Sequence, residues 1–205
     1  MAITSIKTGS SFTNQIKYND FLAGNTAYSP IPPNSYESIE TVTVGSGGTT
    51  TVTFSSIPST YTHLQLRFIV RANNASNVFS AAMRYNSDSG ANYTYHLMYG
   101  GGGGTPSAFS ATGQTVDYSP NVMGTNTSNT FVGNIVDILD YKDTNKFKTI
   151  RTFGGGDINA AGGAVSFASS LWQSTSAINS IAISTNGYGN LLQYSHFALY
   201  GIKGA

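Results

Sequence analysis

Alternation of apolar and polar residues with a period of two is the feature that most constrains the fold of this chain. In the stretch HLQLRFIVR, residues 63–71, four apolar side chains fall on one face of an extended strand, and Ile69 alone interrupts the polar residues on the other face. No window of a dozen residues maintains a helical period. The sequence therefore predicts a chain with almost no helix, built from half-buried β-strands.

Nine further stretches have the same character and are expected to form strands. They are residues 39–44, 49–57, 78–85, 93–99, 131–139, 147–153, 164–172, 178–184 and 195–202. Clusters of Gly, Asn, Ser and Thr separate them, as turns require. Many short strands joined by such turns favour an all-β fold, an antiparallel β-sandwich or jelly roll.

The chain has an arm and one domain. Its 205 residues suffice for one domain with a sizeable core, and are too few for two ordinary domains. Residues 1–36 end in SPIPPNSY, whose prolines favour an extended spacer. We expect an N-terminal arm with a Pro-rich linker over 1–36 and the sandwich over 37–205. Two long loops, 100–130 and 154–163, interrupt the strands, and we expect the first to pack on a neighbouring subunit.

The arm is rich in large apolar side chains, which a segment this short cannot bury internally. These residues are Phe12, Ile16, Tyr18, Phe21, Leu22 and Tyr28. The proline spacer separates them from the domain, so we expect them to dock on another protein. The alternative is that the arm folds back as an edge strand over its own sandwich.

The charge of the chain is low and balanced. Only 9% of residues are charged and the formal net charge is +1, so no strong field exists to attract nucleic acid or an anionic membrane surface. The sequence contains no cysteine, which excludes disulfides and thiolate metal sites. Neither a signal peptide nor a membrane-spanning run is expected, because the N-terminus lacks an apolar core and no apolar run reaches about 18 residues.

No constellation of residues predicts catalysis, a cofactor or a metal site. The only glutamates, Glu37 and Glu40, lie where the linker ends, and three aspartates gather in DILDYKD at a strand end and turn, where solvent exposure is expected. The three histidines stand on separate predicted strands, and neither a nucleophile elbow nor a P-loop is present. The stretch NSDSGANY, residues 86–93, favours a hairpin turn, although its oxygen atoms leave Ca²⁺ binding open.

Aromatic residues on a weakly charged β surface suit either subunit packing or sugar binding. Tyr95 and Tyr99 in YTYHLMYG and Trp172 in SSLWQST are the candidates for a glycan or interface site. For Trp172 we expect a core or interface position first and a sugar platform second. A monomer with this composition would expose large weakly polar surfaces, which favours association.

Three parts of the chain carry a resemblance. They are the arm TSIKTGSSFTNQIKYNDFLAGN, the stretch SYESIETVTVGSGGTTTVTFSSIPSTYTHLQLRFIVR, and the two C-terminal stretches SLWQSTSAINSIAI and SHFALYGIKGA. Together they resemble structural proteins of tailed bacteriophages, particularly marine and cyanobacterial ones. The resemblance implies an N-terminal virion-attachment segment, a β-sandwich or jelly-roll module and, often, a homotrimer.

The resemblance therefore implies a non-enzymatic virion protein, assembled in the host cytoplasm, that serves as a capsid decoration or head-fibre protein. Its partners would be copies of itself and the capsid, portal or tail proteins. The six apolar arm residues would be the attachment residues. The alternative is a receptor-binding tail-fibre protein that recognises host surface glycans. A polysaccharide-degrading tailspike would need a pair of carboxylates that the sequence does not offer.

Overall fold

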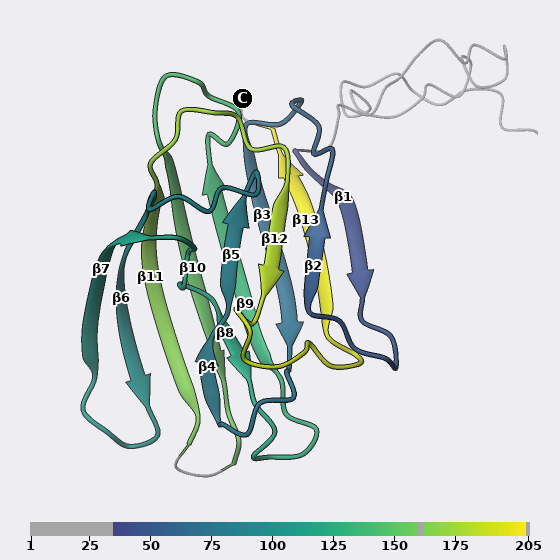
Figure 1. The fold of residues 1–205 in the computed structure, drawn as a ribbon, viewed down its shortest axis with the longest axis vertical. Helices are drawn as coiled ribbons and strands as arrows, with labels where there is room; N and C mark the ends of the chain where they lie inside the picture. The colour runs from purple at the N-terminus through teal and green to yellow at the C-terminus, as the bar shows by residue number, and fades with distance from the viewer. Residues whose placement is uncertain (1–34, 160–161, 204–205) are drawn as a thin grey trace, which may run out of the picture. The chain divides into compact units, whose positions relative to one another are not determined.

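The computed structural model describes residues 35–159 and 162–203, so the predictions for residues 1–34, including the six attachment residues, lie outside the described residues. The described residues form thirteen β-strands and no helix (Figure 1). The strands are β1 (Tyr36–Thr43), β2 (Thr51–Phe54), β3 (His63–Val70), β4 (Val78–Ser80), β5 (Ala82–Tyr85), β6 (Tyr93–Gly101), β7 (Ser107–Gln114), β8 (Asn121–Met123), β9 (Val132–Leu139), β10 (Lys148–Gly156), β11 (Ala164–Trp172), β12 (Ile181–Ser184) and β13 (His196–Ile202).

One large sheet forms the first layer. Its eight strands are ordered β1-β13-β3-β9-β10-β11-β6-β7, and every neighbouring pair is antiparallel. Side chains alternate between its two faces, as the period of two requires. In β3 the four apolar residues Leu64, Leu66, Phe68 and Val70 are buried on one face, which confirms the predicted half-buried strand.

Two small sheets form the second layer, one of order β2-β12-β5 and one of β4 and β8. Figure 1 shows them in front of the middle of the large sheet, with β6 and β7 extending beyond them at one side. Apolar residues of both layers join in one core, for example Phe54 and Ile183 with Leu66 and Phe197. This arrangement confirms the predicted all-β antiparallel sandwich.

All ten predicted strands are present, although the predicted strand 78–85 divides into β4 and β5 at Ala81. The prediction of a strandless loop over 100–130 was wrong, because β7 pairs with β6 and β8 pairs with β4 there. The predicted loop 154–163 is shorter than expected, since β10 continues to Gly156. The glycines at the start of both stretches led to these errors, because Gly is depleted in strands yet compatible with them.

The first strand begins at Tyr36, at the end of the Pro-rich linker, and the chain divides into two units, Met1–Ser35 and Tyr36–Ala205. Within residues 35–159 and 162–203, no helix is available that could cross a membrane.

Gly201 in β13 provides a test of how closely the core is packed. A methyl group on Gly201 would overlap the ring of Tyr61, which is 8% exposed and whose hydroxyl donates a hydrogen bond of 3.0 Å to Glu37. We expect Gly201→Ala to lower the free energy of unfolding by about 1–3 kcal/mol, because overpacking displaces the ring. Urea denaturation measures this change.

Gly133→Ala is the matched control, because Gly133 lies in β9 of the same sheet and a methyl group there would meet nothing within 4 Å. A similar loss of stability in both variants would show that the cost comes from replacing a strand glycine and not from the contact with Tyr61.

Candidate functional site

Large apolar side chains form a row across the outer face of the large sheet, the face that points away from the small sheets. Ile135 in β9 lies directly opposite Phe153 in β10, Phe153 opposite Phe167 in β11, and Phe167 opposite Met98 in β6. Phe153, Phe167 and Met98 are 54%, 51% and 64% exposed. We call Ile135, Phe153, Phe167 and Met98 the outer row. Apolar side chains aligned on four neighbouring strands form a continuous surface suited to contact with another molecule.

Strand β11 is inverted relative to an ordinary half-buried strand. Val165 and Phe167 point outward and are about half exposed, whereas Ser166 and Ser170 point inward and are 4% exposed. A strand with one solvent-exposed face normally has the opposite arrangement. The inversion indicates that the outer face of β11 is suited to contact with an apolar partner. On the inner face, Ser166 and Ser170 are suited to contact with polar groups.

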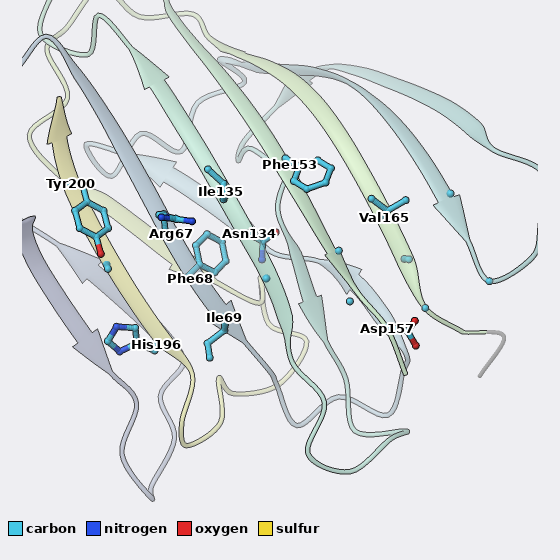
Figure 2. A pocket seen from close by; sticks show the side chains of 18 residues that line it. Arg67, Phe68, Ile69, Asn134, Ile135, Phe153, Asp157, Val165, His196 and Tyr200 are labelled. Carbon is cyan, nitrogen blue, oxygen red and sulfur yellow. The ribbon is translucent and has the colours of Figure 1, made fainter. Parts of the chain in front are cut away.

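A groove of about 990 Å³ lies next to the outer row on the same face (Figure 2). Its floor includes Gly133 and Gly155, which are paired across β9 and β10 and carry no side chains. Phe153 borders this floor, and Arg67, His196, Tyr200 and Asp157 contribute polar side chains to the lining. The groove is open to solvent.

A layer of buried polar side chains lies on the inner face of β10 and β11, beneath the outer row. Residues 116–123 cover this part of the sheet, and Asp117 lies at the centre of the layer with 1% of its surface exposed. One carboxylate oxygen of Asp117 accepts hydrogen bonds of 2.9 Å from the Ser119 amide and from the Ser170 hydroxyl. The other accepts one of 3.2 Å from the Tyr85 hydroxyl.

Further bonds extend the polar layer across the sheet. The hydroxyl oxygens of Ser119 and Thr152 lie 2.8 Å apart. Asn121 and Asn134 form two bonds of 2.9 Å, in which the Asn121 amide donates to Oδ1 of Asn134 and Nδ2 of Asn134 donates to the Asn121 carbonyl. Nδ2 of Asn121 also donates to the Ser166 hydroxyl. Because these groups are buried and bonded to one another, the layer has a structural role and no access to a solute.

Burial is the largest influence on Asp117 and raises the pKa of its carboxyl group, while the hydrogen bonds from Ser119, Ser170 and Tyr85 lower it by less. Tyr85 is buried beside it, and burial together with the Asp117 charge raises the pKa of the Tyr85 hydroxyl well above its ordinary value. A perturbed carboxyl group can mark an active site when it lies in a cleft. Asp117 is 1% exposed and enclosed by its hydrogen-bond partners, so the raised pKa reflects burial.

Lys148 is a second buried ionisable group, with none of its surface exposed. Its ammonium donates to four backbone carbonyls, those of Asp143 at 2.6 Å, Lys146 at 2.9 Å, Thr175 at 3.2 Å and Ser174 at 3.5 Å. Burial lowers the pKa of this ammonium. The carbonyls come from two separate turns, so the side chain joins these turns and is not available as a nucleophile.

The histidines lie apart on β3, β6 and β13, as the sequence predicted. Nδ1 of His63 accepts the Asp140 amide at 2.9 Å, and Nδ1 of His196 lies 2.8 Å from the Thr43 hydroxyl. In the described part of the chain, no three residues among His, Asp and Glu are grouped so that they could hold a metal ion.

The acidic side chains of DILDYKD form hydrogen bonds or ion pairs with neighbouring side chains. Asp137 is half-buried on the outer face and accepts a hydrogen bond of 2.8 Å from Gln65. Asp140 and Asp143 share Lys146, at 2.5 Å and 3.6 Å. Glu37 pairs with Lys203 at 2.8 Å.

The three aromatic candidates for a glycan or interface site do not form one exposed platform. Trp172 is 2% exposed and packs 5.7 Å from Tyr85 between ring centroids, so its position is in the core and the alternative of a surface glycan or interface role for it was wrong. Tyr95 and Tyr99 lie on the inner side of β6, where they are half-buried. The prediction missed the outer row, because the alternation in β10 and β11 separates the two faces of each strand but does not reveal which face the second layer covers.

The turn at 86–93 is held by Asp88. Oδ2 of Asp88 accepts bonds from the Trp172 indole at 2.7 Å and from Nδ2 of Asn92 at 2.9 Å, and Oδ1 accepts the Gly90 amide at 2.8 Å. Burial tends to raise the pKa of the Asp88 carboxyl group, but these donors outweigh burial and lower it. The Asp88 carboxylate accepts three N–H groups of the chain itself, and these hydrogen bonds account for the predicted turn.

No family model matches this chain, and no curated protein or solved structure matches it either.

The raised pKa of Asp117 predicts how stability depends on pH. A carboxyl group whose pKa is raised by folding contributes stability that is present below its unfolded pKa of about 3.9 and is lost as the pH rises through its folded value. We therefore expect the stability of Asp117→Asn relative to wild type to increase from acid to neutral pH, by about 1.4 kcal/mol per unit by which the pKa is raised. Urea denaturation over this pH range measures the difference.

Asp88→Asn is the matched control, because folding lowers the pKa of Asp88 and the sign is reversed. Its stability relative to wild type should fall as the pH rises from acid to neutral. If both variants respond to pH in the same direction, the account of Asp117 is wrong.

Proposed function

We propose that this chain is a non-enzymatic structural protein of a tailed-bacteriophage virion, a capsid decoration or head-fibre protein attached through residues 1–36. The described domain would then act as an assembly module that packs against neighbouring subunits on the particle. The proposed class of particle rests on the resemblance carried by the arm, residues 35–71 and the two C-terminal stretches.

The inverted strand β11, with the outer row that crosses it, is the observation that supports an assembly role. It places half-exposed Val165 and Phe167 outward while serines face the core. Exposed apolar surfaces of this kind mark contacts between proteins, whose centres are rich in aromatic residues and Met and poor in charge. The low overall charge of the chain fits the same role.

Homotrimerisation and attachment to capsid, portal or tail proteins belong to this proposal. Three copies could place their outer rows around a common axis, where each would cover the exposed apolar side chains of the next. Light scattering on the full-length chain tests the number of copies.

Receptor binding by a tail fibre is the second candidate, and one observation favours it. On the outer face, Tyr36 stacks on Tyr200 at 4.7 Å between ring centroids, and Tyr200 and Arg67 line the groove. A stacked aromatic pair near a guanidinium can hold a sugar ring by stacking and hydrogen bonds. Binding on a glycan array that disappears with Tyr200→Ala would favour this candidate over the assembly role.

The attachment role of the arm is tested in the full-length chain by Phe21→Ser with Leu22→Ser. We expect this variant to keep the wild-type melting temperature but to be absent from particles, because the two apolar side chains no longer dock; each would contribute roughly 1.5–3 kcal/mol when buried. Electron microscopy and quantitative blotting of purified virions measure incorporation. Ser10→Ala with Ser11→Ala in the same arm is the control, and normal occupancy of the Phe21 and Leu22 variant would reject attachment through these residues.

The assembly role of the outer row is tested by Phe153→Ser with Phe167→Ser. Both side chains are about half exposed, so the melting temperature of the domain should change little while association with neighbouring subunits weakens. Sedimentation velocity on the full-length protein measures association. Arg151→Ala alters an exposed residue on the same face of β10 and should leave association unchanged. Unchanged association in the double variant would remove the support for this proposal.

A further inference from the structure

The last strand of the large sheet, β7, has an open edge. Among the described strands its only partner is β6, so alternate backbone N–H and C=O groups along Ser107–Gln114 have no strand to bond on the other side. Such an edge is a template for pairing with another chain unless something protects it.

Neither face of β7 is buried. Ser107 to Ser110 are all exposed, and Phe109, on the same side as the core, is 54% exposed because the small sheets do not extend over it. Figure 1 shows β6 and β7 projecting beyond the small sheets. On the other face, Ala108 lies directly opposite Met98 of the outer row. The strand therefore presents an apolar side chain on each face as well as an open edge.

Strand β1, at the opposite edge of the same sheet, is protected against pairing with another chain. Strand β1 carries Glu37 and Glu40, and its register shifts between Ser38 and Glu40, which interrupts regular pairing. Charged residues and bulges of this kind prevent edge-to-edge association. Strand β7 has neither a charged residue nor a proline, and its irregularity lies near its C-terminal end, where Gly113 has a positive φ of 62°.

We propose that β7 pairs with β7 of a second copy of this chain, antiparallel and about a two-fold axis. A second copy fits because β7 is uncharged, so two copies meet without the like-charge repulsion that Glu37 and Glu40 would cause at β1. Pairing would join two eight-stranded sheets into one and bring Phe109 of each copy toward the other on one face and Ala108 on the other. A two-fold contact is also self-complementary and closes without forming a filament.

This inference does not depend on the proposed virion role. It adds a two-fold contact to whatever assembly the other surfaces form, so each copy in that assembly would pair with one further copy. Copies are then present in even numbers.

A charged side chain placed in β7 tests the pairing in the full-length protein. Ser110 lies near the middle of β7, so Ser110→Lys places one ammonium group on each of the two paired strands. Because like charges on paired strands repel, we expect the mass measured by sedimentation equilibrium to fall two-fold while the melting temperature stays at the wild-type value. Thr41→Lys makes the same change at an exposed position on the other edge strand and should leave the mass unaltered. The proposal is overturned if the wild-type protein remains monomeric at its highest soluble concentration. It is also overturned if the wild-type assembly has an odd number of copies and Ser110→Lys does not change that number.

Single cysteines provide a second measurement, which does not rely on disrupting the contact. Because the chain has no cysteine, each variant forms a disulfide only between copies. Among Ala108→Cys, Phe109→Cys and Ser110→Cys, the position nearest the axis should form a covalent dimer under mild oxidation, and Thr41→Cys should not. Equal or greater dimer formation by Thr41→Cys overturns β7 pairing. Loss of pairing with normal incorporation into virions would count against this inference alone, whereas intact pairing without incorporation would count against the virion role alone.

Discussion

The unequal size of the two layers is the constraint on which the rest of this structure depends. One layer has eight strands in a single sheet, and the other has only three and two. A sheet buries apolar side chains only where an opposing layer reaches it. Most of the apolar core therefore lies where β2, β12 and β5 cover the large sheet, whereas residues 116–123 cover β10 and β11 with both polar and apolar groups and no strand covers β7.

The polar layer around Asp117 determines how the covering segment is placed. Apolar contacts tolerate small displacements, whereas hydrogen bonds require particular distances and directions. Asn121 and Asn134 bond reciprocally, and Gly154 lies close to both, where a methyl group would overlap the Asn134 amide oxygen. A segment with little regular structure of its own is thus fixed by directional bonds to the inner face of the sheet. Ser166 and Ser170 of β11 face inward and complete this layer with their hydrogen bonds to Asn121 and Asp117.

Most strands could be predicted from the sequence because they meet the apolar core on one face, and burial of one face produces the alternation. Strand β7 could not be predicted, because neither of its faces is buried and SAFSATGQ has no clear alternation. Which face of β11 points toward the core could not be predicted either, because the pattern of Val165 to Trp172 does not reveal which face the second layer covers. In the sequence Asp117 is one more polar residue within a long loop, and only the structure reveals that it is buried.

Lys148 acts as a covalently tethered counterpart of a structural metal ion. A free cation bound by carbonyl oxygens of two turns would leave when its concentration falls or a chelator competes for it. The ammonium of Lys148 occupies the same kind of oxygen cage, yet it is attached to the chain and cannot dissociate. The connection between these turns is therefore independent of the ionic composition of the surroundings, because no exchangeable ion takes part in it.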